Sequence, residues 1–494
     1  MSRLVTLLAL AAIAANAADL NAVRKWRAAN EHAILREFAD LLAIPNIARD
    51  TANIRRNAAL LTRMLERRGA QTRLLEVEGA PPVVYGEILV PGAKRTLLFY
   101  AHYDGQPVTP KDWTSDPWTP TLRSGSNNIS WPEAGKPFDP EWRLYARSTS
   151  DDKGTIIAMM SALDALKAAN QRPTSNIKFV FEGEEEAGSN SLAKILAKHK
   201  DLVQGDVWLI CDGPVHQTRR QQLYFGARGV IAFDLTVYGP RRELHSGHYG
   251  NWAPNPAMAL AQLLATLKDP SGKVTVEGFY DGIAPLTPSE RAALASAPDN
   301  DDELRRELLI GETEGEGRKL IDLINQPSLN VRGLQSAGVG PEARNVVPAT
   351  ATASLDIRLV KGMDPDAAVN RVIEHIRRQG WHVVENEPDE KTRLAFPRVL
   401  RIRRDHGYRA VRSPMDTPIA KEIAAAVRAA RGETILMPTL GGSVPLYVIE
   451  DGFNAPMVGV PIANHDNSQH GPNENIRLRN LWDGIETMAA LFTM

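Results

Sequence analysis

Residues 148–154, with the sequence STSDDKG, join a polar loop rich in Trp and Pro to an apolar segment that begins TIIAMM. The adjacent carboxylates of Asp151 and Asp152 stand at the start of this segment, which we predict to be a helix over 155–169. Desolvating two neighbouring carboxylates is costly unless positive charge offsets them. The dipole of a helix N-terminus supplies only part of that charge. An Asp here could simply cap the helix, but the rest of the sequence favours a bound cation.

Three predicted strands end in side chains that can bind metal ions. The strands cover 96–100, 177–181 and 207–211, and they are followed by His102 and Asp104, by the run EGEEE at 182–186, and by Asp212. The carboxyl ends of parallel strands share one edge of a sheet, where ligands bind. Carboxylates gathered there without counter-charge would repel one another by several kcal/mol, and a pair of divalent cations removes that repulsion. Imidazole and carboxylate ligands without thiolate suit zinc, and less uniquely manganese or cobalt.

The order of the predicted elements indicates two domains. Helices over 20–70 and alternating strands and helices after them predict an α/β layer with a mainly parallel sheet. The segment 226–411 differs, because the alternating strand at 229–238 opens a β-α-β-β-α-β order typical of an α+β domain with two helices on one face. We therefore predict a first domain from 20–225 and 412–494, with the second domain inserted at 226–411. A polar insertion at 270–325 and a Trp-rich loop at 106–143 have no assigned role.

Composition excludes some functions. The 494 residues include 58 basic and 59 acidic side chains, for a net charge of -1, which does not favour binding to nucleic acid or to an acidic membrane surface. Cys211 is the only cysteine, so no disulfide can form within the chain. Residues 1–17 have a basic start, a short apolar run and the ending Ala-Asn-Ala, and predict a signal peptide cleaved near Ala17. The protein is then periplasmic or secreted, with no membrane span after processing.

The motifs together resemble the co-catalytic di-zinc peptidases, a family that includes carnosine dipeptidase, carboxypeptidase G and aminoacylase. The motifs are HxD at 102–104, DDKG at 151–154, EEEAGS at 184–189, Asp212, LHSG at 244–247, DIR at 356–358, GGSVP at 441–445 and HxxNE at 470–474. They are most similar to the dipeptidase branch, and the resemblance spans roughly residues 25–494. The segment 411–416 lacks a histidine expected from the carnosine dipeptidase pattern, which leaves the substrate side chain undetermined.

The resemblance implies two divalent metal ions per chain, most simply zinc. His102 and Asp212 would hold one metal, Glu186 and His470 would hold the other, and Asp151 would bridge the two. In this family the peptide bond that follows the bridging Asp151 is expected to be cis.

The resemblance also implies roles for other residues. Glu185 would act as the general base on a water that bridges the metals, and Asp104 would orient the ring of His102. His245 would stabilise the oxyanion in the second subunit of a homodimer.

The same resemblance implies how the substrate is held. Arg344 would bind the carboxylate of the substrate, together with Gly442 and Ser443. His216 and His465 are expected to lie at the surface or behind the site, without a role of their own.

The function implied is that of a metal-dependent peptidase with a catalytic first domain and a lid or dimerisation domain at 226–411. It would cleave dipeptides or short peptides beside a free C-terminal carboxylate. Two alternatives stay open: an N-acyl amino acid amidohydrolase that uses the same pair of metals, and a binding protein that keeps the fold without catalysis.

Overall fold

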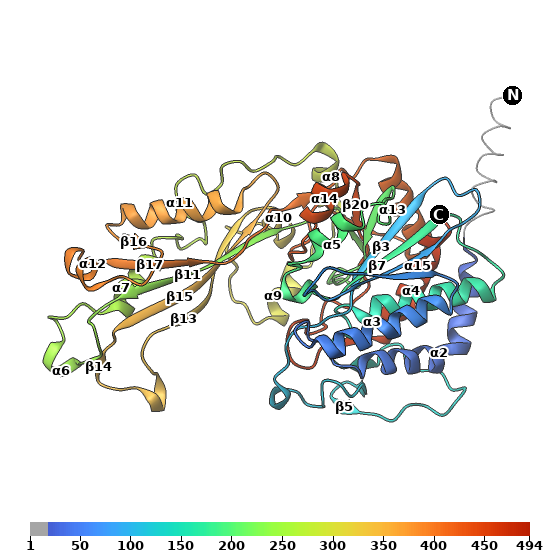
Figure 1. The fold of residues 1–494 in the computed structure, drawn as a ribbon, viewed down its shortest axis with the longest axis horizontal. Coiled ribbons are helices and arrows are strands. Elements are labelled where there is room, and N and C mark those ends of the chain that lie inside the picture. The colour runs from blue at the N-terminus through green and yellow to red at the C-terminus, as the bar shows by residue number, and fades with distance from the viewer. Residues whose placement is uncertain (1–17) are drawn as a thin grey trace.

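The computed structural model describes residues 18–494 and sets two large β-sheets end to end along the longest axis of the molecule (Figure 1). The predicted signal peptide at 1–17 lies outside the described residues and stays a prediction. In the part of the chain that the structure describes, no helix is both long and apolar enough to cross a bilayer.

The first domain is built on an eight-stranded sheet. In sheet order the strands are β1 (Gln71–Leu75), β2 (Val83–Ile88), β7 (Asn176–Glu182), β3 (Thr96–His102), β8 (Val207–Ile210), β20 (Met457–Gly459), β9 (Gln222–Tyr224) and β19 (Ile435–Met437). Strands β7, β3, β8 and β20 are parallel neighbours, whereas β1 and β2 are antiparallel at one edge. The prediction of a mainly parallel sheet is therefore confirmed.

Both faces of this sheet are buried, as its apolar strands require. Phe99 faces one helical layer, and its neighbours Leu98 and Tyr100 face the other. The first layer consists of α2 (Leu20–Leu42), α3 (Thr51–Glu66), α4 (Lys153–Ala168), α13 (Pro418–Arg431) and α15 (Leu478–Phe492). The second layer contains α5 (Leu192–Lys198) and α14 (Tyr447–Phe453).

A small sheet lies beside this domain and carries the loop that the sequence left unassigned. Its strands are β21 (Asn475–Arg477), β6 (Arg143–Tyr145), β4 (Thr121–Ser124) and β5 (Asn127–Asn128), in that order. Strand β6 leads directly into residues 148–152, so this sheet positions the chain that enters α4.

The second domain, which we call the lid, is a mainly antiparallel sheet with one covered face, in which only β16 and β17 pair in parallel. In sheet order its strands are β13 (Ser328–Gln335), β15 (Thr350–Leu359), β11 (Gly229–Tyr238), β17 (Val399–Arg404) and β16 (His382–Val384). Phe233 of β11 pairs with Leu355 of β15, and both point into the core formed with α7 (Pro256–Leu264) and α11 (Pro365–Arg378). The predicted β-α-β-β-α-β order is present, but β17 follows it and lies inside the sheet, which leaves β16 at the edge.

The lid ends in a short two-stranded sheet at the end remote from the first domain (Figure 1). It consists of β12 (Leu244–His245) paired with β14 (Val346–Val347), followed by α6 (Ser246–Tyr249). The helix α12 (Glu390–Ala395) lies near the same end of the lid (Figure 1).

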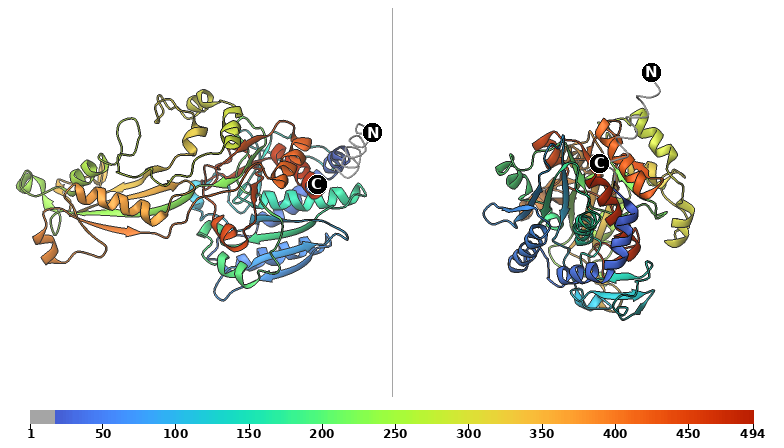
Figure 2. Two further views of the ribbon diagram at one scale, coloured as in Figure 1. Left: turned by 90° about the horizontal axis from the view of Figure 1, so that it is seen from above. Right: turned by 90° about the vertical axis from the view of Figure 1, so that its right-hand side faces the viewer.

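The polar insertion folds into three helices and packs against the first domain, although its sequence falls within 226–411. The helices are α8 (Pro288–Ser296), α9 (Asp301–Glu307) and α10 (Leu320–Ile324). Helix α8 contacts β19, and the buried Ala293 belongs to the core of the first domain. In the right-hand view of Figure 2 the yellow-green helices of the insertion lie along the side of this domain.

A buried ion pair fixes the insertion. Nε of Arg412 lies 2.9 Å from the carboxylate of Glu290, and both side chains are buried. Arg412 also donates to the carbonyl oxygens of Ala284 and Pro285. Glu290 closes a capping box with Thr287 at the start of α8, so one carboxylate holds both the helix end and the arginine. Arg412 belongs to the segment 411–416, which lacks the histidine of the carnosine dipeptidase pattern. This segment is therefore in direct contact with the insertion.

We predict that Glu290→Gln loosens α8 without unfolding the first domain. Glutamine can still accept the Thr287 hydrogen bond but leaves Arg412 uncompensated, and breaking a buried pair costs about 3–5 kcal/mol. Hydrogen exchange of the α8 amides should therefore accelerate by about 100-fold or more. The control Glu303→Gln, on the exposed surface of α9, should leave this exchange unchanged. An unchanged rate in Glu290→Gln would contradict the anchoring role of the pair.

Candidate active site

Asp151 lies between two imidazoles. Its Oδ1 is 2.8 Å from Nε2 of His102, and its Oδ2 is 3.3 Å from Nε2 of His470. His102, Asp151 and Asp212 offer ligand atoms within 4.8 Å of one another, and so do Asp151, Glu186 and His470. The structure thus brings together all five residues predicted to bind metal, with Asp151 common to both groups.

The sheet explains why these side chains meet. Strands β7, β3 and β8 are adjacent and parallel, so the residues that follow them lie along one edge. His102 ends β3, the turn with Glu185 and Glu186 follows β7, and Asp212 follows β8. Asp151 comes from the start of α4, and the peptide bond between Asp151 and Asp152 is cis, as expected.

Glu474 holds the loop that presents Asp151. Its carboxylate accepts hydrogen bonds from the backbone N–H groups of Ser148, Ser150 and Asp151, and one from the Ser150 hydroxyl. The guanidinium of Arg147 lies 2.8 Å from the same carboxylate, and both side chains are buried. Two residues of the HxxNE motif therefore serve the site. His470 is itself a candidate metal ligand, and Glu474 holds the loop that presents another candidate, Asp151.

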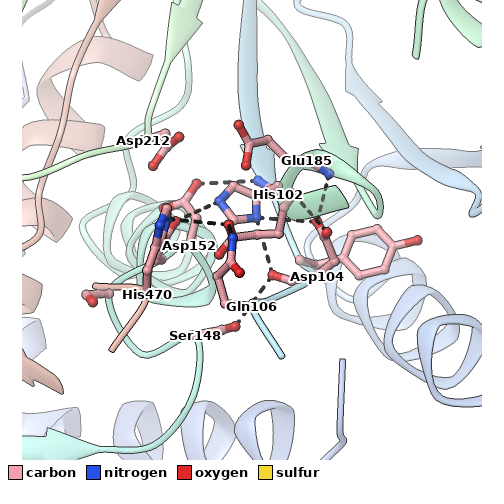
Figure 3. A network of polar contacts seen from close by, with 12 residues as sticks. His102, Asp104, Gln106, Ser148, Asp152, Glu185, Asp212 and His470 are labelled. Atoms are coloured by element: carbon pink, nitrogen blue, oxygen red, sulfur yellow. Dashed lines mark hydrogen bonds and ion pairs between the residues drawn. The ribbon is translucent and has the colours of Figure 1, made fainter. Parts of the chain in front are cut away.

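Asp104 connects His102 to the acidic turn (Figure 3). Its Oδ1 is 3.4 Å from Nδ1 of His102. The same carboxylate accepts from the backbone N–H of Glu185 at 3.1 Å and of Glu186 at 3.0 Å. Gln106, which the sequence analysis did not single out, donates to Oε2 of Glu186 at 2.7 Å. These contacts fix the His102 ring and both glutamates in one arrangement.

The site fits two divalent cations on its donor set and its charge. Oδ1 of Asp212 is buried and has no hydrogen-bond partner among the described residues; Oδ2 of Asp151 is also buried and accepts no hydrogen bond there, although Nε2 of His470 lies 3.3 Å away. Burial raises the pKa of the Glu185 carboxyl well above its ordinary value, and burial raises the pKa of Asp212 to about 6. Cations at the two groups would offset this concentration of carboxylates and occupy the free oxygens. Two imidazoles and three carboxylates suit zinc, manganese or cobalt.

A cavity of about 620 Å³ opens beside the ligand groups and contains further polar side chains. Glu185, Gly442 and Ser443 line it together with Asp151. Arg358 also lines it and donates from Nη1 to the Ser443 hydroxyl at 2.7 Å. Arg358 comes from β15 of the lid, whereas Ser443 comes from the first domain, so this pair joins the two domains at the cavity. The sequence analysis quoted Arg358 in the DIR motif without giving it a role, because its proximity to Ser443 depends on tertiary structure.

The structure does not bring His245 and Arg344 to this cavity. His245 lies in β12 and its Nδ1 accepts from the backbone N–H of Gly247 at 3.1 Å. Arg344 is exposed and lies 2.8 Å from Glu243. Because β12 pairs with β14, the two residues are neighbours at the far end of the lid. Within one chain neither residue lines the cavity that contains Glu185 and Asp212.

His216 and His465, which the sequence analysis gave no role, both line the cavity. His216 is buried, with 6% of its surface exposed. The two histidines stand on the chain segments that carry Asp212 and His470, so the cavity continues outward from the metal-ligand groups.

Comparison with known proteins agrees with this geometry. Residues 98–494 match the family described as "Peptidase family M20/M25/M40". The chain is 29% identical over 414 residues to the Cys-Gly metallodipeptidase dug1 of Schizosaccharomyces pombe, covering 82% of this chain and 81% of that protein. It is 29% identical over 420 residues to the human Beta-Ala-His dipeptidase, covering 83% and 77%. The crystal structure of the M20 family metallo-carboxypeptidase Sso-CP2 from Sulfolobus solfataricus superposes with a TM-score of 0.77, at 26% identity over 93% of this chain and 98% of that one.

We predict that Glu474→Gln destabilises the first domain and weakens metal binding. The substitution keeps the shape of the side chain but leaves Arg147 buried and uncompensated, which costs about 3–5 kcal/mol. Urea unfolding should report this loss, and titration calorimetry with Zn²⁺ should show a higher Kd. The matched control Glu133→Gln removes an exposed pair with Lys136 and should change stability by less than about 1 kcal/mol. Equal effects of the two substitutions would contradict the role of Glu474.

Proposed function

The chain belongs to peptidase family M20/M25/M40, and on that premise we propose that it is a metal-dependent dipeptidase that hydrolyses the peptide bond beside a free C-terminal carboxylate. The observation that carries this proposal is the single cavity that joins the two ligand groups sharing Asp151 to the pair Arg358 and Ser443. A cation pair and a carboxylate-binding pair in one cavity suit a short substrate with a free carboxyl end. The dipeptidases among its relatives support the same substrate class.

We propose that His102, Asp151 and Asp212 hold one metal ion and that Asp151, Glu186 and His470 hold the other, with zinc as the expected metal. When bound, such a pair polarises the scissile carbonyl and lowers the pKa of a water molecule. Glu185 lines the cavity beside these ligands and has a carboxylate free to take a proton from the attacking water. It then delivers the proton to the leaving amine. Asp104 is a positioning residue, because it fixes the His102 ring and the backbone of Glu185.

We propose that Arg358 binds the carboxylate of the substrate, because its guanidinium lines the cavity and a planar fork suits a carboxylate. Ser443 is its hydrogen-bond partner, and its hydroxyl, which donates to the Gly229 carbonyl at 3.4 Å, could turn to donate to the same carboxylate instead. Gly442 offers backbone beside them. These residues fix the distance between the carboxyl end of the substrate and the metals, which selects for short peptides.

His245 and Arg344 can contribute only from a second copy of the chain, and we propose a homodimer in which the lid end of one subunit reaches the cavity of the other. The surface beside His245 supports this proposal. Tyr249 ends α6, the helix that follows His245, and its ring lies 6.0 Å from that of Trp252. The two side chains are 38% and 79% exposed, and large apolar side chains gathered on a surface mark a contact site. In the dimer His245 would donate a hydrogen bond from Nε2 to the developing oxyanion, because its Nδ1 already accepts from Gly247. Arg344 would add a second cation near the carboxyl end of the substrate.

The proposed reaction can be tested with a panel of dipeptides and N-acyl amino acids. The purified protein should release amino acids from dipeptides with Zn²⁺ or Mn²⁺, lose this activity after chelation and regain it when metal is restored. Glu185→Gln should bind the same metals in calorimetry yet lower kcat by about 10²–10⁴-fold, because the proton acceptor is gone. Near-normal kcat in Glu185→Gln would remove that residue from its role. Cleavage of N-acyl amino acids alone would replace the dipeptidase by an amidohydrolase.

The dimeric site predicts complementation between two inactive variants. His245→Ala and Glu185→Gln should each lose activity, one through the oxyanion contact and the other through the base. After subunit exchange, half of the sites in a mixed dimer combine an intact Glu185 with an intact His245, so activity should return. Each variant incubated alone is the control. Mixtures that have exchanged subunits, as shown by mass spectrometry, and yet stay inactive would contradict a site shared between subunits.

A further inference from the structure

We propose that helices α9 and α10 of the insertion form the subsite for the side chain of the substrate's C-terminal residue, and that this subsite selects a large apolar side chain. The inference rests on the proposed dipeptidase function and specifies which dipeptides the site prefers. We call the cavity-facing surface of these two helices the insertion wall, defined by Leu304, Leu308, Leu320, Ile321 and Ile324.

The position of α10 assigns the insertion wall to the carboxyl end of the substrate. A Cβ atom on Gly441 would lie 3.3 Å from Cδ1 of Ile324, so α10 packs directly on the Gly-Gly-Ser loop. Ser443, two residues further on, is the partner of Arg358. In an amino acid the side chain and the carboxylate leave the same Cα atom. A residue whose carboxylate is held by Arg358 and Ser443 therefore places its side chain near α10.

The chemistry of the insertion wall is apolar where it meets the cavity. Leu308 and Leu320 are 56% and 37% exposed although both line the cavity, and covering such surface is favourable. Some of the charged groups beside them are engaged in other contacts. The carboxylate of Asp299 lies 2.9 Å from Nζ of Lys319, and Asp301 accepts from the backbone N–H of Leu320 at 2.8 Å. The insertion wall therefore presents mainly apolar side chains to a ligand.

His216 opposes a basic side chain at this subsite. The backbone N–H of Thr218 donates to its Nδ1, so the neutral ring carries its proton on Nε2. Burial lowers the pKa of His216 to about 4, which keeps the ring neutral at physiological pH. Its Nε2 has no hydrogen-bond partner in the part of the chain that is described, and the ring lines the cavity near Asp301. An N–H donor meets an ammonium or guanidinium donor unfavourably, although the carboxylates of Asp301 and Glu307 in the cavity lining would attract one.

The insertion wall is fixed to the side of the cavity that carries the metal-ligand groups. The ion pair between Glu290 and Arg412 anchors α8 to the first domain, and α9 and α10 follow α8 along the chain. The wall therefore keeps its distance from Asp212 and Ser443 when the lid moves, as a specificity pocket requires.

The test compares kcat/KM for Ala-Leu, Ala-Gly and Ala-Lys in the dimeric, metal-loaded enzyme. The wild type should prefer Ala-Leu to each of the others by about tenfold or more, since burial of an aliphatic side chain favours binding. Leu320→Asp places a charge on the insertion wall and should lower the ratio of Ala-Leu to Ala-Gly by at least about tenfold, whereas Leu320→Met should keep it. Leu320 is partly exposed, so these substitutions leave the fold intact.

Leu309→Asp is the matched control. Leu309 follows Leu308 directly and is 91% exposed, but it does not line the cavity, so the ratio and the activity should stay at the wild-type level. Hydrolysis of all three dipeptides with an unchanged ratio in Leu320→Asp, or a wild-type preference for Ala-Gly or Ala-Lys, would overturn the subsite and leave the dipeptidase in place. Failure to hydrolyse any of the three would overturn the proposed function and the subsite with it.

Discussion

The negative charge buried at the carboxyl edge of the eight-stranded sheet is the constraint on which the rest of the site depends. The chain has buried cations nearby, but they are engaged elsewhere. Arg147 is paired with Glu474, and Nζ of Lys153 donates to the carbonyl oxygens of Leu41 and Ile44. Neither neutralises Asp151 or the other proposed ligands. The two buried cations thus hold loops in place, and the oxygens of the proposed ligands stay available to metal ions.

The sequence analysis predicted most of the first domain because its strands are apolar on both faces and end in polar residues. It missed α15, whose polar residues Asn480 and Glu486 are buried together with its apolar ones, so that burial in this helix does not follow residue polarity. It also missed β17. Leu400 and Ile402 of that strand face the lid core, but Arg401 and Arg403 alternate with them on the uncovered face. An arginine-rich run of this kind resembles a surface loop until the partner strand β11 is known.

Four of the five proposed metal ligands could be grouped from the sequence, because His102, Glu186 and Asp212 follow predicted strands and Asp151 precedes a predicted helix, whereas His470 came only from the family resemblance. Adjacent parallel strands then bring the members together without further information. Arg358 and His216 could not be placed in this way. Arg358 lies in the lid and contacts Ser443 only where the two domains join. His216 lies in the loop between β8 and β9, and the course of that loop places it in the cavity. Such contacts depend on how elements distant in the sequence are arranged, which local patterns do not encode.

The junction between the domains determines which parts of the site can move. The chain passes between them at β10 (Gly226–Ala227) and β18 (Val411–Arg412), which pair closely, since a Cβ atom on Gly226 would lie 2.1 Å from the carbonyl oxygen of Val411. The backbone N–H of Arg228 donates to the carbonyl of Gly442 beside this crossing. Points near a pivot move little during a rotation, so Arg358 and Ser443 would stay paired while the far end of the lid swings widely. The proposed contact with the substrate carboxylate would then persist through a domain motion, whereas the proposed contribution of His245 would depend on that motion.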